Sequence, residues 1–149
     1  MTYLKFKSII IVFWFIWWLI ALWTDVIGFF AHLGWLHASW APDTNLPFLI
    51  ESLKMYQLPL WMIMVLFFGI LLGLFLSTIS FLWSILALNQ PHTVWLARAR
   101  TAFIISISFW LAFFLADQLI MKFDLEENHM VQGGFELLTF LAVYLLPNE

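Results

Sequence analysis

The stretch LWMIMVLFFGILLGLFLSTISFLWSILAL, residues 60–88, contains no charged side chain. At about 1.5 Å per residue a single helix over it reaches roughly 43 Å, whereas the hydrocarbon core of a bilayer is about 30 Å thick. The helix therefore tilts or extends beyond the core. An apolar run of this length predicts a transmembrane helix.

A row of small residues follows one face of this helix, at spacings of three and four: Gly69, Gly73, Ser77, Ser80 and Ser84. In lipid, apolar side chains gain little by leaving the lipid tails, so helices associate where small residues let their backbones approach. We predict helix packing at Gly69, Gly73 and Ser77. The packing partner is either another helix of the same chain or a second subunit, including a second copy.

The composition of the chain predicts one integral membrane domain over residues 1–149. Hydrophobic residues make up 64% and charged residues 10%, against about 45–50% and about 25% in soluble proteins. The chain has no cysteine, so no thiol redox chemistry, iron–sulfur cluster or disulfide can be built from it, and we predict no cofactor. The net charge of −3 and the lack of a basic patch argue against a nucleic-acid partner.

Three further spans and one amphipathic segment are predicted around the central helix. A first span covers about 8–31; its apolar run is longer than a signal-peptide core, so we expect it to be uncleaved. Residues 46–56 carry apolar side chains at helical spacing and predict a short outer amphipathic helix. A polar connection up to Arg100 leads to a third span at 101–121, and an acidic connection at 122–132 leads to a fourth at 130–146. The predicted fold is an all-α integral membrane four-helix bundle with this outer amphipathic helix.

The basic residues predict the topology, because Lys and Arg near the spans are retained in the cytoplasm. One side carries Lys5, Lys7, Arg98 and Arg100. The other carries Lys54 and Lys122 beside five acidic residues, Asp43, Glu51, Asp124, Glu126 and Glu127. We therefore expect a multi-pass protein of the bacterial inner membrane, with both termini in the cytoplasm.

Three acidic residues, Asp25, Asp117 and Glu136, fall inside the predicted spans at one depth. A charge at the bilayer centre costs between about 2.5 and 17 kcal/mol, depending on the method, so such acids usually face the bundle interior or pair. We therefore expect an inward-facing acidic cluster under the outer surface. The candidate ligand or proton residues are Asp25, His32, Asp117, Gln118, Gln132 and Glu136.

Several roles for this cluster stay open. It could bind a divalent cation, with His32, His37 and His129 as candidate metal ligands, relay protons, or hold a polar headgroup. It could also be plain structural pairing of polar groups. Ser77, Ser80 and Ser106 have no neighbouring base at a plausible depth and are interpreted as helix-packing hydroxyls. The chain contains no nucleophile or phosphate-binding motif, so nothing in it proposes an enzyme.

The passage TDVIGFFAHLGWL, the amphipathic PFLIESLKMY and the following LPLWMIMVLFFGILL resemble small bacterial four-helix inner-membrane proteins of the DoxX-like group. The resemblance covers about the first half of the chain and depends on the order and spacing of these segments. The chain lacks the arginine- and glycine-rich first helix of that group. The quinone-linked redox roles of the group are therefore not carried over, nor is any of its site residues.

Two classes of function follow from these observations. The first is a non-catalytic accessory or assembly subunit that packs against other membrane subunits, or against a second copy, through its small-residue and aromatic faces. The second is a proton-coupled, metal or solute binding or transport unit that uses the carboxylates. A quinone- or lipid-binding redox accessory is a further alternative.

Overall fold

The computed structural model describes residues 3–37 and 45–147, so Asp43, one of the acidic residues of the predicted outer side, lies outside the described residues. Within these two ranges the chain is all-helical, which confirms the predicted class. Its elements are α1 (Tyr3–His32), α2 (Asn45–Ser52), a 3-10 turn η2 (Lys54–Tyr56), α3 (Leu60–Ile85), α4 (His92–Ile120) and α5 (Phe123–Leu145).

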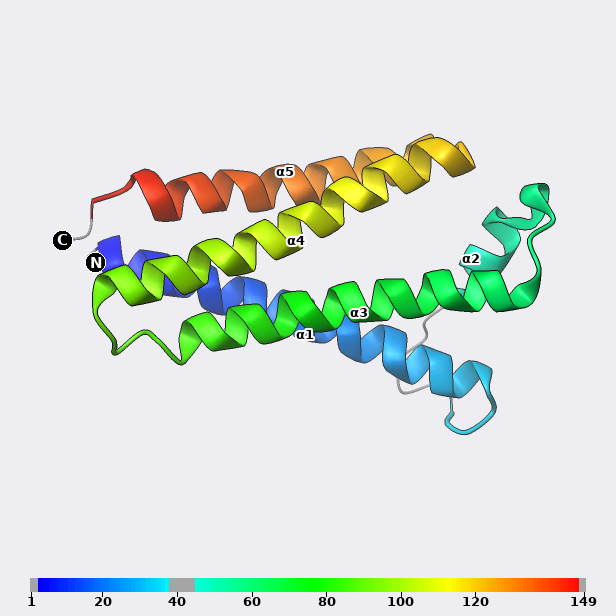
Figure 1. The fold of residues 1–149 in the computed structure, drawn as a ribbon, viewed down its shortest axis with the longest axis horizontal. Coiled ribbons are helices and arrows are strands. Elements are labelled where there is room, and N and C mark those ends of the chain that lie inside the picture. Colours follow the sequence, from blue (N-terminus) through cyan, green and yellow to red (C-terminus); the bar gives the residue numbers. More distant parts are fainter. Residues whose placement is uncertain (1–2, 38–44, 148–149) are drawn as a thin grey trace.

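The four long helices pack in the spatial order α1, α3, α4, α5. The chain termini and the α3–α4 connection lie at one end of the molecule, and α2 lies at the opposite end (Figure 1). The α4–α5 pair and the α1–α3 pair are closest at the end with the termini and diverge toward α2 (Figure 1).

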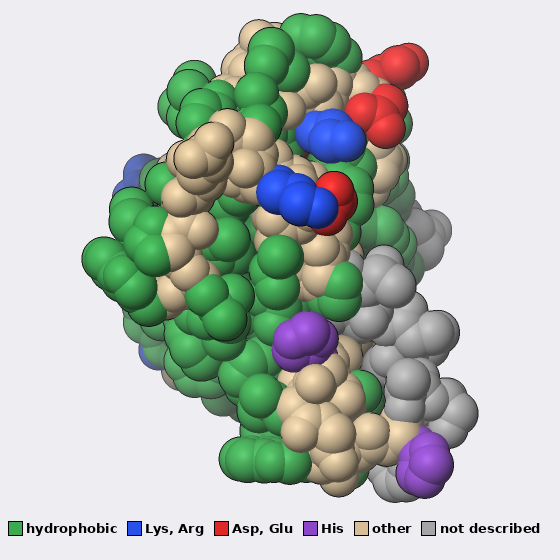
Figure 2. Space-filling model, turned by 90° about the vertical axis from the view of Figure 1, so that its right-hand side faces the viewer, with side chains coloured by type: hydrophobic (Ala, Val, Ile, Leu, Met, Phe, Trp, Pro, Cys, Tyr) green, Lys and Arg blue, Asp and Glu red, His purple; other side chains and the backbone are tan. Residues whose placement is uncertain are grey.

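Three helices in the described ranges are long and apolar enough to cross a membrane: α1, α3 and α4. Their outward faces carry large apolar side chains, such as Ile20, Val65 and Leu115, the last of which is 70% exposed. Soluble proteins rarely expose apolar surface on this scale. The length and composition of these helices indicate a membrane protein. Lys, acidic and His side chains gather on the end that carries α2 (Figure 2).

Two predicted connections are helical instead. Helix α4 begins at His92, so the predicted polar connection up to Arg100 is mostly its first turns, and the Pro91 ring precedes it at the N-cap position. Helix α5 begins at Phe123, although an acidic connection was expected over 122–132. Asp124 and Glu126 lie in the first turn of α5, where negative side chains favour a helix N-terminus. Hydropathy identifies only the part of a helix that is apolar enough for lipid. Both α4 and α5 begin before that part, in polar sequence.

The other helix boundaries differ less from the predicted ones. Helix α1 begins five residues before the predicted 8–31 span, and α3 ends at Ile85 rather than at residue 88. The amphipathic segment 46–56 is split into α2 and the turn η2, which Gln57 ends with a left-handed backbone at φ 51°. Helix α3 packs against α4 of the same chain at Gly73, where an added Cβ would collide with the ring of Phe109.

The first turns of α1 are tied to the end of α5 by a buried lysine. Lys7 Nζ donates a hydrogen bond to the Leu146 carbonyl oxygen over 2.7 Å, at the C-cap of α5. A positive charge at this position also interacts favourably with the dipole of α5, whose C-terminal end is negative.

Replacing Lys7 by methionine is expected to lower the free energy of unfolding in detergent by about 1.5–3 kcal/mol, the contribution of a hydrogen bond to a charged group. Denaturant titration followed by tryptophan fluorescence measures this change. The matched control is Lys5→Met at the exposed neighbouring lysine, for which little change is expected. Equal losses for both variants would contradict the assigned contact.

Candidate functional site

Glu136 is fully buried and accepts hydrogen bonds from side chains of two other helices. The Ser106 hydroxyl of α4 donates to Oε1 over 2.5 Å, and the Trp110 indole of α4 donates to Oε2 over 2.7 Å. The Trp18 indole of α1 donates to Oε1 over 3.4 Å. These contacts correct the interpretation of Ser106 as a packing hydroxyl alone, because its oxygen also meets a carboxyl group. The side chain of Glu136 thereby links α1, α4 and α5.

Tryptophans surround this carboxyl group and extend the link between α1 and α5. The Trp14 indole donates to Thr139 Oγ1 over 2.8 Å, and that hydroxyl donates to the Glu136 carbonyl oxygen. The Trp18 and Trp110 rings lie 5.2 Å apart between centroids. Buried indoles usually find an acceptor for their N–H group, and here the acceptors are on α5.

Asp117 of α4 and His129 of α5 form a second polar pair, nearer to the α2 end. His129 Nδ1 lies 2.5 Å from Asp117 Oδ2. The His129 ring packs against Phe113 at 4.7 Å and against Trp110 at 5.7 Å between centroids. Through Trp110 the pair adjoins the Glu136 group.

Asp25 of α1 is also buried and meets the first residue of α2. Asn45 Nδ2 donates to Asp25 Oδ1 over 2.6 Å. Asn45 is not among the predicted site residues, so its contact with Asp25 is a site interaction that sequence reasoning missed. Asn45 stands directly before the apolar positions of α2, but no pattern in the chain pairs it with a residue twenty positions earlier.

The two aspartates line one cavity of about 200 Å³ beneath α2. Its polar side chains are Asp25, Asn45, Asp117 and His129, and its other lining residues are apolar. Glu136 does not line this cavity. The three acids therefore do not form the single cluster that was expected. Glu136 is hydrogen-bonded inside the helix interface, whereas Asp25 and Asp117 face the cavity.

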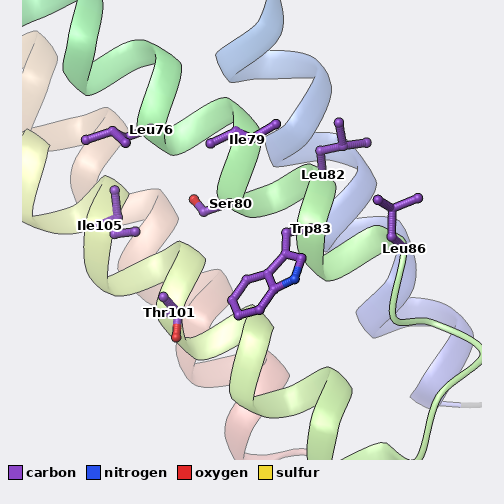
Figure 3. A pocket seen from close by; sticks show the side chains of 8 residues that line it. All are labelled: Leu76, Ile79, Ser80, Leu82, Trp83, Leu86, Thr101 and Ile105. Atoms are coloured by element: carbon purple, nitrogen blue, oxygen red, sulfur yellow. The ribbon is translucent and has the colours of Figure 1, made fainter.

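An apolar groove of about 570 Å³ adjoins the cavity, between α3 and α4 and beneath α2 and η2. A separate pocket of about 390 Å³ lies between α3 and α4 toward their connection (Figure 3). Two of its lining side chains have hydroxyl groups, Ser80 and Thr101, and both donate to carbonyl oxygens of their own helices. Its remaining lining is apolar apart from the Trp83 indole, so this pocket offers little polar chemistry.

The other predicted ligand residues lie outside the cavity. His32 and His37 are exposed, Gln118 donates to the Glu126 carboxylate, and Gln132 donates to Asn128. Among the described residues no group of three or more histidine and acidic side chains could hold a metal ion. Of the packing residues, Ser77 is buried and Gly73 contacts Phe109, whereas an added Cβ at Gly69 meets nothing within 4 Å.

Comparisons of the chain with protein-family models, curated proteins and solved structures find no match. What this helical membrane protein does is therefore inferred from its own residues. Two buried carboxylates, an imidazole and an amide around open space can bind a hydrogen-bond donor or a positively charged group.

Proposed function

We propose that this chain is a multi-pass membrane protein that binds a small ligand in the cavity beneath α2. The observation that carries the proposal is the pair of buried aspartates, Asp25 and Asp117, that face the same cavity from different helices. Buried acids within membrane spans are costly and commonly mark ligand or ion sites. Asn45 Nδ2 donates to Asp25 Oδ1 and His129 Nδ1 lies beside Asp117 Oδ2, so both carboxyl groups already bind polar partners at the cavity, and a carboxylate has about four acceptor sites.

The proposed arrangement in the membrane is a four-span bundle, with α5 as the fourth span and α2 lying at the outer surface. Helix α5 has 23 residues, enough to cross the hydrocarbon core, and its buried Glu136 is hydrogen-bonded within the bundle. The Lys7–Leu146 contact brings the beginning of α1 and the end of α5 together, which agrees with both termini on one side. The basic residues favour the cytoplasmic side of a bacterial inner membrane for that end.

The accessory-subunit hypothesis remains a prediction with weaker support. The small-residue row was its main argument, and at Gly73 that row packs against Phe109 of the same chain. Gly69 lies open, but it lines the apolar groove. The face of α3 that was expected to bind another subunit is therefore partly covered by α4 of the same chain.

The test is to identify small molecules that travel with the protein after gentle extraction from its membrane. We expect one molecule near equimolar amount with the unchanged protein, and about tenfold less with the Asp25→Asn, Asp117→Asn double variant, because a hydrogen bond to a charged group contributes about 1.5–3 kcal/mol. Mass spectrometry of the released molecules measures this ratio.

The matched control is Glu127→Gln, which changes an exposed carboxylate outside the cavity to an amide. Its ligand content is expected to equal that of the unchanged protein. Equal content in all three proteins would overturn the proposal. Stoichiometric companion proteins without any small molecule would instead support an accessory subunit.

A further inference from the structure

The polar cavity and the apolar groove are neighbours with different chemistry. Five residues line both, Leu49, Ile70, Phe113, Ala116 and Ile120. The groove alone has about 570 Å³, within the range of about 300–1,000 Å³ that is typical of ligand pockets. A molecule that fills both parts needs a polar group at one end and a hydrocarbon part at the other.

The charges at the polar end favour a cation. Two carboxyl groups, Asp25 and Asp117, face the cavity with one imidazole, and no Lys or Arg is among the lining residues. The Lys122 ammonium lies 5.7 Å from the ring of Phe48, which lines the cavity, but Lys122 itself is not among the lining residues. A primary ammonium supplies three N–H donors and no acceptor, which matches carboxylate oxygens.

The groove faces the side of the molecule that lipid would cover. It lies between α3 and α4, both long and apolar enough to cross a membrane, and its lining includes the exposed Leu66 and Leu119. Gly69 leaves room for a chain because it has no side chain there. Charged side chains on the α2 end (Figure 2) are typical of the headgroup level, and the polar cavity lies at the same end.

The geometry points to a bilayer lipid with a primary-amine headgroup as the ligand, with its ammonium in the Asp25–Asp117 cavity and one acyl chain in the groove. This inference rests on the proposed function and adds the class of ligand. The lipid enters sideways from the bilayer, and its second chain stays among the surrounding lipids.

The test uses native mass spectrometry of the full chain in detergent micelles, titrated with phosphatidylethanolamine or with phosphatidylglycerol carrying the same acyl chains. We expect phosphatidylethanolamine to bind at about tenfold lower concentration, as one charge-assisted contact implies. The Asp25→Asn, Asp117→Asn variant is expected to bind both lipids alike. No preference in the unchanged protein, or a preference that survives both substitutions, would overturn the inference.

A second pair of variants tests the groove. Gly69→Leu places a side chain in it, and binding of both lipids is expected to fall severalfold. Gly134→Leu on α5 is the matched control, because an added Cβ there also meets nothing within 4 Å and Gly134 lines neither space. Equal lipid binding by both glycine variants would contradict the groove as the chain site.

Failure of this inference is distinguishable from failure of the proposed function. If extraction identifies a different molecule that is lost from the aspartate variant, the cavity binds a ligand and the assignment to an amine lipid is wrong. If no molecule is lost from that variant and phosphatidylethanolamine shows no preference, both the function and the ligand class are wrong.

Discussion

Replacing Glu136 by leucine is expected to lower the free energy of unfolding in detergent by about 2–4 kcal/mol. The substitution leaves the Trp110 and Trp18 indoles without their carboxyl acceptor inside the helix interface, whereas the Ser106 hydroxyl keeps the Ala102 carbonyl oxygen as an acceptor at 3.0 Å. An unsatisfied buried donor costs about 1–3 kcal/mol, and interhelical hydrogen bonds in membranes lie toward the low end of that range. Reversible unfolding followed by circular dichroism measures the loss.

Two comparisons distinguish the stability lost with the hydrogen bonds of Glu136 from the stability lost through the changed volume of its side chain. Glu136→Gln keeps one acceptor oxygen, so a smaller loss is expected than for leucine. In a double-mutant cycle, Trp110→Phe is expected to cost less in the Glu136→Leu background than in the unchanged protein, because its partner is already absent. Additive losses in this cycle would show that Trp110 and Glu136 do not interact.

Replacing Gly73 by leucine is expected to destabilise the protein by about 1–3 kcal/mol, whereas Gly69→Leu is expected to change stability by less than about 0.5 kcal/mol. A Cβ at Gly73 would overlap the Phe109 ring, and that ring is confined by Phe113 and Trp18 at 4.7 and 5.9 Å between centroids. A Cβ at Gly69 meets nothing within 4 Å. Thermal unfolding in micelles compares the two variants.

The same pair of glycines separates stability from ligand binding. Gly69→Leu is expected to fold normally and to bind less lipid, and Gly73→Leu is expected to fold less stably. Adding Phe109→Ala to Gly73→Leu is expected to recover part of the lost stability by removing the overlapping ring. No recovery would mean that the cost arises elsewhere along α3.

The sequence predicted the apolar segments well and the helix ends poorly. Most of the predicted stretch 60–88 is α3, which ends at Ile85, because a long uncharged run has few alternatives to a helix in lipid. The stretches before residue 101 and around 122–132 were interpreted as connections because they contain charged residues. Helices can continue into the aqueous phase, where such side chains are solvated, and hydropathy cannot mark that continuation.

Helical spacing likewise predicted burial but not contacts. Asp25, Asp117 and Glu136 were expected to face inward, and all three are buried. Which side chains meet them depends on how each helix is rotated and shifted against its neighbours, and one sequence does not contain that information. The contacts of Ser106 with Glu136 and of Asn45 with Asp25 therefore required the structure. His32 and His37, two of the three candidate metal ligands, are exposed.

The link that Glu136 makes between three helices bears on how the protein is made. Ribosomes release α1, α3 and α4 before α5, so the donors Trp18, Ser106 and Trp110 are already in the bilayer when the carboxyl group arrives. Helix α5 is absent from the helices that are apolar enough to insert by composition. In the four-span arrangement proposed above, the three earlier helices therefore act as a template for the insertion of α5.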